Sequence, residues 1–153
     1  MKNEISKTKQ RRDFLKTSAI LTGGALLSGI QLAGAYASGS DVIKVALIGC
    51  GSRGTGAAFQ ALSTKFNLKL IAMADAFPDK LEKSYQTLLT KFGAEKISVP
   101  ADKKFVGFDG YISAMQDADV VMLCTPPGFR PAHFAEAVKQ NKQIFMEKPV
   151  ATD

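Results

Sequence analysis

Residues 45–56 read VALIGCGSRGTG, an apolar run that ends abruptly in a cluster of glycines. The run from Val42 to Ile48 is short and almost continuously apolar, as expected for a strand buried on both faces of a parallel sheet. Glycine turns tightly and lets another group approach the backbone, because no side chain stands in the way. The stretch therefore predicts a buried strand that ends where something comes close to the main chain.

The chain after Ser40 alternates between apolar runs and amphipathic patterns. Further strands are expected at residues 68–74, 104–107, 120–124 and 143–146, with helices around 57–62, 78–92, 109–115 and 131–141. The short third helix should turn Tyr111, Ile112 and Met115 inward, and the fourth should carry one apolar side made of Phe134, Ala135 and Val138. Strands that alternate with helices pair in parallel through right-handed crossovers. The pattern predicts a doubly wound α/β sheet in the order 3-2-1-4-5.

Charge is distributed unevenly along the chain. The net charge of the 153 residues is +6, but residues 1–37 hold six basic and two acidic residues, which leaves only +2 for the remainder. The remainder has no basic stripe with interleaved aromatic residues, so the sequence argues against nucleic-acid binding. It also has no cluster that predicts a metal site.

Residues 1–37 resemble a twin-arginine export signal. Arg11-Arg12 is followed by DFLK, then by an uncharged, glycine-rich stretch and the small-x-small site at residues 35–37. We expect cleavage after Ala37 by a signal peptidase, engagement of the twin-arginine export machinery and a periplasmic or exported location. After cleavage no stable membrane insertion is expected. The alternative is an uncleaved membrane anchor, because the uncharged stretch is long enough to span a bilayer.

The glycine cluster fits a nucleotide-binding loop. Residues 49–54 (GCGSRG) spell G-x-G-x-x-G between a predicted strand and a predicted helix. In such a loop the first glycine makes the turn, the second admits a pyrophosphate and the third lets helix and strand pack closely. Helix amides then face the phosphates. The candidate cofactor-binding residues of this loop are Gly49, Gly51, Ser52, Arg53 and Gly54.

Asp75 ends the second predicted strand, 26 residues after Gly49. A carboxylate at this place accepts hydrogen bonds from the adenosine ribose, and it disfavours a 2′-phosphate, so NAD is expected over NADP. Arg53 keeps NADP open, because its side chain could reach a 2′-phosphate, the pyrophosphate or solvent. A plain turn with a helix cap, or a methyl-donor-binding fold, are the alternatives. An exported cofactor has no pool to exchange with, so we expect it to be tightly bound.

Two further motifs follow predicted strands. Thr125-Pro126-Pro127-Gly128 comes after the fourth strand, and Glu147-Lys148-Pro149 after the fifth. The carboxyl ends of parallel strands share one rim, where ligands of such sheets bind. Lys148 is thus a candidate catalytic residue, able to orient a substrate hydroxyl or share its proton. A solvated lysine in a turn is the alternative.

Together GCGSRG, Asp75, TPPGFR and MEKPVATD resemble the glucose–fructose oxidoreductase / inositol dehydrogenase / rhizopine-catabolism (Gfo/Idh/MocA) family over residues 42–153. The resemblance implies that the glycine loop and Asp75 bind the dinucleotide. It places Lys148 beside nicotinamide and substrate, with a cis bond before Pro149. The loop residues that it implies beside the cofactor are Thr125, Pro126, Glu147 and Lys148.

One position departs from the family pattern. Many members have a histidine five residues after the loop threonine, where this chain has Arg130. Arg130 could hold an acidic or polyhydroxy substrate, or face water. His133, three residues further on, reads as an ordinary helix residue.

The resemblance also implies a second α+β domain that supplies most substrate contacts and is absent from this chain. We therefore expect residues 38–153 to be the dinucleotide-binding domain of an exported oxidoreductase acting on CH–OH groups of a sugar, cyclitol or sugar derivative. A glycosidase that borrows a hydride from NAD and returns it is one alternative. A truncated nucleotide-binding fragment without activity is another. Uncovered apolar surface would favour self-association, so a homo-oligomer is open.

Cys50 and Cys124 end the neighbouring first and fourth predicted strands. Adjacent strands lie about 4.8 Å apart, which is compatible with disulfide geometry. Two buried thiols are the expected state, and a disulfide is the alternative that an oxidising compartment would permit.

Overall fold

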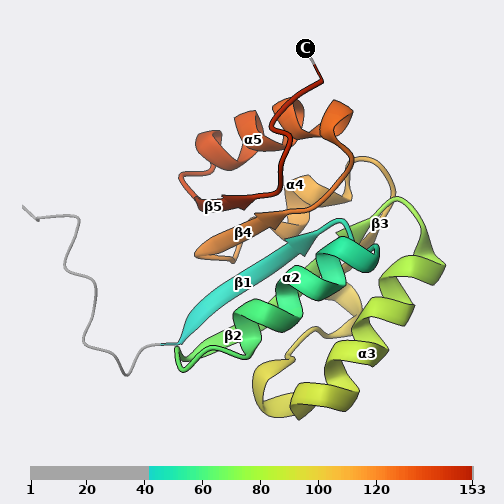
Figure 1. Cartoon of the computed structure of the whole chain (residues 1–153), viewed down its shortest axis with the longest axis vertical. Coiled ribbons are helices and arrows are strands. Elements are labelled where there is room, and N and C mark those ends of the chain that lie inside the picture. The colour runs from blue at the N-terminus through green and yellow to red at the C-terminus, as the bar shows by residue number, and fades with distance from the viewer. Residues whose placement is uncertain (1–41, 153) are drawn as a thin grey trace, which may run out of the picture. The chain divides into compact units, whose positions relative to one another are not determined.

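The computed structural model describes residues 42–152, and the expected export segment with its cleavage point lies outside the described residues. The strands are β1 (Ile43–Ile48), β2 (Leu68–Asp75), β3 (Lys104–Val106), β4 (Val120–Leu123) and β5 (Gln143–Met146). The helices are α2 (Ser52–Leu62), α3 (Pro78–Lys96), α4 (Gly110–Ala114) and α5 (Arg130–Lys139), with short 3₁₀ turns at Ala101–Lys103 and Pro127–Phe129. All pairings are parallel, and the order β3-β2-β1-β4-β5 confirms the predicted doubly wound sheet (Figure 1).

Helices cover both faces of the sheet because successive strand residues point to opposite sides. In β1, Val45 and Leu47 pack with residues of α2 and α3, whereas Ala46 and Ile48 pack with residues of α4 and α5. The two apolar clusters are thus separated by the sheet itself. Among residues 42–152, no helix has the length and hydropathy needed to cross a bilayer.

Two helix faces differ from the sequence prediction. In α5 the buried residues are Arg130, His133 and Ala137, whereas Phe134 and Val138 are exposed. Ile112 in α4 is also exposed, while Met115 is fully buried as predicted. The apolar pattern of α5 was misleading because its polar residues find hydrogen-bond partners inside, which hydropathy alone does not reveal.

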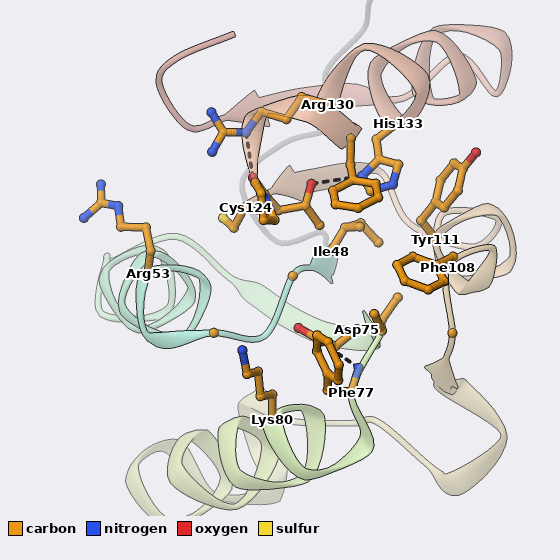
Figure 2. Close-up of a pocket in the computed structure, with 18 of the residues that line it drawn as sticks. Ile48, Arg53, Asp75, Phe77, Lys80, Phe108, Tyr111, Cys124, Arg130 and His133 are labelled. Atoms are coloured by element: carbon orange, nitrogen blue, oxygen red, sulfur yellow. Dashed lines mark hydrogen bonds between the residues drawn. The ribbon is translucent and has the colours of Figure 1, made fainter. Parts of the chain in front are cut away.

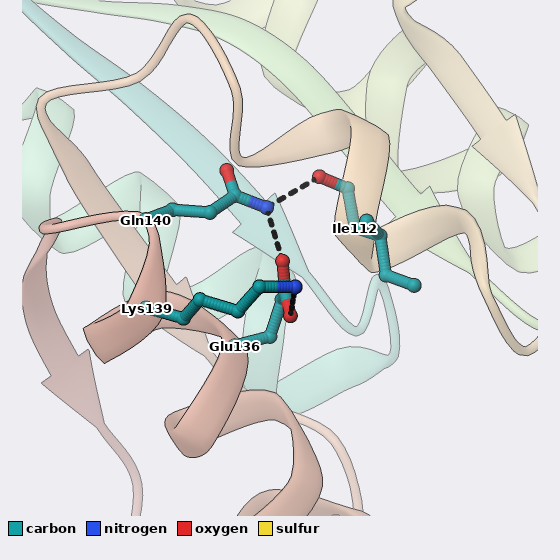
Figure 3. A network of polar contacts seen from close by, with 4 residues as sticks. All are labelled: Ile112, Glu136, Lys139 and Gln140. Atoms are coloured by element: carbon teal, nitrogen blue, oxygen red, sulfur yellow. Dashed lines mark hydrogen bonds and ion pairs between the residues drawn. The ribbon is translucent and has the colours of Figure 1, made fainter.

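Polar side chains join the end of α5 to α4 (Figure 3). The side-chain amide of Gln140 donates to the carbonyl of Ile112 at 3.0 Å and to the carboxylate of Glu136 at 2.8 Å. Lys139 pairs with the same carboxylate at 3.2 Å. These bonds lower the pKa of Glu136, with the bond from Gln140 as the largest cause. The network fixes the far end of α5, whose beginning lies at the candidate site.

Main-chain hydrogen bonds tie together the loops at the carboxyl ends of the strands. The amide of Gly49 donates to Ala74 O and the amide of Cys124 to Ile48 O, both at 2.8 Å. The amide of Glu147 donates to Leu123 O at 3.1 Å. The glycine loop, Asp75 and the two later motifs are therefore brought to one rim, as the sequence predicted.

Candidate functional site

The first and third glycines of the loop are required by close packing. Gly49 has φ +94°, and a Cβ there would lie 2.7 Å from the amide nitrogen of Thr125. A Cβ on Gly54 would lie 1.8 Å from the carbonyl oxygen of Gly49. The turn at Gly49 and the close helix–strand contact at Gly54 agree with the sequence prediction.

The second glycine differs, because a Cβ on Gly51 would meet nothing within 4 Å. Gly51 is also the N-cap of α2, where it supplies no side-chain hydrogen bond, and the first turn of α2 contains no acidic residue. The first amides of a helix lack intrahelical acceptors and carry partial positive charge. The loop thus leaves open space over unpaired donors, which suits a phosphate.

Asp75 has a second task that the sequence prediction missed. Its Oδ2 accepts a hydrogen bond from the amide of Cys50 at 2.6 Å, and its Oδ1 accepts one from the amide of Phe77 at 2.9 Å. Each carboxylate oxygen has a further lone pair, so ribose hydroxyls can still bind. Asp75 holds the glycine loop in position as well as facing the cavity.

A cavity of about 550 Å³ lies above this rim (Figure 2). Figure 2 shows Asp75, Tyr111 and His133 arranged around it. Seven predicted site residues line the cavity, namely Gly49, Gly51, Ser52, Arg53, Asp75, Thr125 and Pro126. Of the other predicted residues, Gly54 packs beneath the loop, and Glu147 and Lys148 lie outside the lining. The volume is within the range of small-molecule and cofactor sites.

Aromatic side chains form part of the cavity wall. Phe108 and Phe129 are stacked with centroids 5.9 Å apart, and Tyr111 lies 4.1 Å from the ring of His133. Phe77 and Phe108 are exposed at 53% and 68%. Only their spatial arrangement reveals them, because these rings come from three separate stretches of the chain, around residues 77, 108–111 and 129–133.

An ion pair links the glycine loop to the Glu147-Lys148-Pro149 loop. Arg53 Nη2 lies 2.6 Å from Glu147 Oε1, with Arg53 63% exposed and the Glu147 side chain only 7% exposed. The hydrogen bond from Arg53 is the largest cause that lowers the pKa of Glu147. The sequence prediction offered Arg53 three partners, and the structure adds a fourth, Glu147.

Arg130 and His133 are both built into the site. Arg130 is 5% exposed, which corrects the alternative that it faces water; its Nε donates to Thr125 O at 2.9 Å and its Nη1 donates to the carbonyls of Glu147 and Pro149. Arg130 also lines the cavity, so its contact with a substrate stays a prediction. His133 is buried, and its Nδ1 shares a 3.0 Å hydrogen bond with Thr125 Oγ1. Burial lowers the pKa of His133 and favours the neutral ring.

Lys148 is exposed, and the bond between Lys148 and Pro149 is cis as predicted. Its side chain has no place in the cavity lining, so its catalytic role stays a prediction. Within residues 42–152, no three histidine, cysteine or acidic side chains come together to hold a metal ion.

Both cysteines are free. Cys50 is buried and Cys124 partly buried. Burial is the largest cause that raises the pKa of Cys124 to about 11, and it raises that of Cys50 further. Both thiols are thus protonated and slow to react near neutral pH.

Comparison with known proteins agrees with this geometry. A family model described as "Oxidoreductase family, NAD-binding Rossmann fold" matches residues 43–153. Inositol 2-dehydrogenase of Rhizobium meliloti is 30% identical over 111 residues, covering 72% of this chain and 29% of that protein. A glycosyl hydrolase family 109 protein of Solibacter usitatus is 29% identical over 149 residues, covering 92% of this chain and 33% of that protein.

Among solved structures, apo scyllo-inositol dehydrogenase of Lactobacillus casei is similar with a TM-score of 0.58 at 25% identity, covering 76% of this chain and 31% of that chain. A structure of the scyllo-inositol dehydrogenase from that organism with NAD(H) and scyllo-inositol gives 0.57 at 25% identity, covering 74% and 30%. This chain spans about a third of the length of these relatives. Because the family model covers residues 43–153, the chain belongs to the Gfo/Idh/MocA oxidoreductase family, and these residues have its NAD-binding Rossmann fold.

Proposed function

We propose that residues 38–153 bind NAD for an exported oxidoreductase that acts on a CH–OH group of a sugar, cyclitol or sugar derivative. The observation that carries the cofactor proposal is the open space over Gly51 at the uncapped start of α2. Asp75 lines the same cavity and suits a ribose with free hydroxyls. Bound nicotinamide would supply the acceptor or donor of a hydride.

The chain's own residues have separate tasks in this proposal. The first amides of α2 hold the pyrophosphate, and Asp75 holds the adenosine ribose. Arg53 already has Glu147 as a partner, so it balances that carboxylate at the rim. Lys148 extends from the same rim and would hold or share the proton of the reacting hydroxyl. Its exposed position leaves it free to contact a substrate bound above the cofactor.

Cofactor binding gives the direct test of this proposal. Titration calorimetry on the purified protein, after removal of any carried-over nucleotide, should give tighter binding of NAD than of NADP. Asp75→Asn should weaken NAD binding roughly tenfold or more, because a carboxylate acceptor is lost. Lys142→Met serves as the control and should bind NAD like the wild type, because Lys142 directly precedes the amino end of β5, whereas the site lies at the carboxyl ends of the strands. Equal binding of both cofactors, or none, would contradict the proposal.

The export and tight-binding proposals need a separate measurement. The protein recovered from the exported fraction should begin after Ala37 and carry one NAD, as native mass spectrometry reads directly. Recovery of the protein only in the cytoplasm would refute export. A chain without bound nucleotide would refute tight binding, and would favour a fragment that lacks activity.

A hydride-borrowing glycosidase is the second candidate. The alignment with the family 109 protein of Solibacter usitatus covers 92% of this chain, so it must include part of residues 1–37. The alignment with inositol 2-dehydrogenase covers only 72% of this chain. The greater extent of the family 109 alignment is the observation that favours the glycosidase. An oxidoreductase should change nicotinamide absorbance when a polyol is added. A glycosidase should release the leaving group of an aryl glycoside with no net change in that absorbance.

A further inference from the structure

Arg130 brings a buried guanidinium to the centre of the rim. The side chain begins at the first residue of α5 and is 5% exposed. Its Nε donates to the carbonyl of Thr125, and its Nη1 donates to the carbonyls of Glu147 and Pro149. The last two carbonyls belong to the residues immediately before and after Lys148. One side chain is thus hydrogen-bonded to the main chain on both sides of the candidate catalytic lysine, and also to Thr125 in the loop beside the cavity.

The chemistry of these contacts favours a positioning role over substrate binding. Two of the three guanidinium nitrogens of Arg130 already donate to main-chain oxygens. A planar guanidinium presents several donors in a fixed fork, whereas an ammonium is a single point of charge. The bonds to the three carbonyls leave from two separate nitrogens, Nε and Nη1, which the single nitrogen of an ammonium cannot reproduce. Its charge is balanced nearby, since Arg130 also contributes to the lowered pKa of Glu147.

Lys148 needs such support because its own side chain is exposed. A misplacement of about 1 Å can slow a reaction on the order of a hundredfold. We infer that Arg130 is a positioning residue, which fixes the main chain around Lys148 relative to Thr125 and so aims the lysine at the reacting hydroxyl. This inference rests on the proposed function for the role of Lys148.

Turnover kinetics on the full-length protein, with its native cofactor, test the inference. Arg130→Lys and Arg130→Ala should each lower kcat roughly 10- to 100-fold, because neither variant can span the three carbonyls. The dissociation constant for NAD should change by less than about threefold, since the glycine loop and Asp75 are untouched. Ethylguanidinium added to Arg130→Ala should restore part of the lost turnover, because it can occupy the place of the missing guanidinium group and donate to the same carbonyls.

Lys142→Met is the matched control for these variants. Lys142 also donates to a backbone carbonyl, that of Gln116 at 2.6 Å, but at the other end of β5. It should keep wild-type kinetics. Full turnover in Arg130→Lys would overturn the inference, because charge alone would then suffice. Equal losses of kcat and NAD affinity would also overturn it, because the whole rim would have collapsed.

A second measurement needs no turnover and separates this inference from the proposed function. In ¹H–¹⁵N spectra of Arg130→Ala, the amide signals of Glu147, Lys148 and Val150 should shift while those of residues 49–54 stay in place. Ethylguanidinium should move the shifted signals back. Unchanged signals at residues 147–150 would overturn the inference. If these signals shift and the wild type turns over no sugar, cyclitol or aryl glycoside, the proposed function fails. The inference that Arg130 positions the main chain around Lys148 would still hold.

Discussion

Replacing Gly54 with alanine tests the close contact on which the glycine loop depends. The new Cβ would lie 1.8 Å from the carbonyl oxygen of Gly49 and 3.2 Å from Cβ of Cys124. A main-chain carbonyl cannot rotate away as a side chain can, so α2 must move by about 1 Å or more. Overpacking of this kind costs about 3 kcal/mol. Alanine returns about 1 kcal/mol through its helix propensity. The net loss in unfolding free energy is therefore about 2 kcal/mol, or roughly 10 °C in melting temperature.

Two other glycines of the same segment provide matched controls in urea unfolding followed by circular dichroism. Gly56 also lies in α2, and a Cβ there would meet nothing within 4 Å, so Gly56→Ala should gain about 0.5–1 kcal/mol. Gly51→Ala should lose less than about 1 kcal/mol. It should nevertheless weaken NAD binding, because its Cβ enters the space kept for a phosphate. Wild-type stability in Gly54→Ala would refute the packing argument, and unchanged NAD affinity in Gly51→Ala would refute the phosphate site.

Three further predictions concern the polar groups of the rim. Asp75→Asn should lower the unfolding free energy by about 1–3 kcal/mol, because its NH2 group replaces one of the two oxygens that accept from the main-chain N–H groups of Cys50 and Phe77; wild-type stability in urea would contradict this. Arg53 lowers the pKa of Glu147 below its ordinary 4.5, so the stability from this pair is full above that value and is lost as the pH falls through the lowered pKa; the advantage of wild type over Glu147→Gln should shrink there, and a pH-independent difference would refute the pairing. The folded protein should react slowly with iodoacetamide near pH 8, because burial raises the pKa of Cys124 to about 11; labelling as fast as in urea would show that the thiols are accessible.

Much of the fold and of the candidate site was predictable from local sequence. The five strands follow from short apolar runs bounded by polar or turn-forming residues, and their parallel order follows from the intervening helices. The same order predicted that the glycine loop, Asp75 and Thr125 would meet at one rim. These inferences succeed because buried parallel strands and tight loops restrict which residue types fit.

The side-chain partners at the rim were not predictable in the same way. Arg53 was expected to reach a phosphate or solvent, and it forms an ion pair with Glu147, which lies far from it in the sequence. Asp75 was expected to bind a ribose, and it also accepts the amide of Cys50. Such contacts join residues far apart in the chain, and several partners were chemically equivalent before the fold selected one.

The sequence by itself determined a doubly wound dinucleotide-binding fold, because hydrophobic periodicity and glycine geometry are local properties of the chain. Only the tertiary structure decided which face of α5 is buried. There the apolar Phe134 and Val138 face outward, while Arg130 and His133 lie inside with partners on the loops after β4 and β5. A buried polar group is tolerated where its hydrogen bonds are made, and whether they are made depends on loops that the fold brings together.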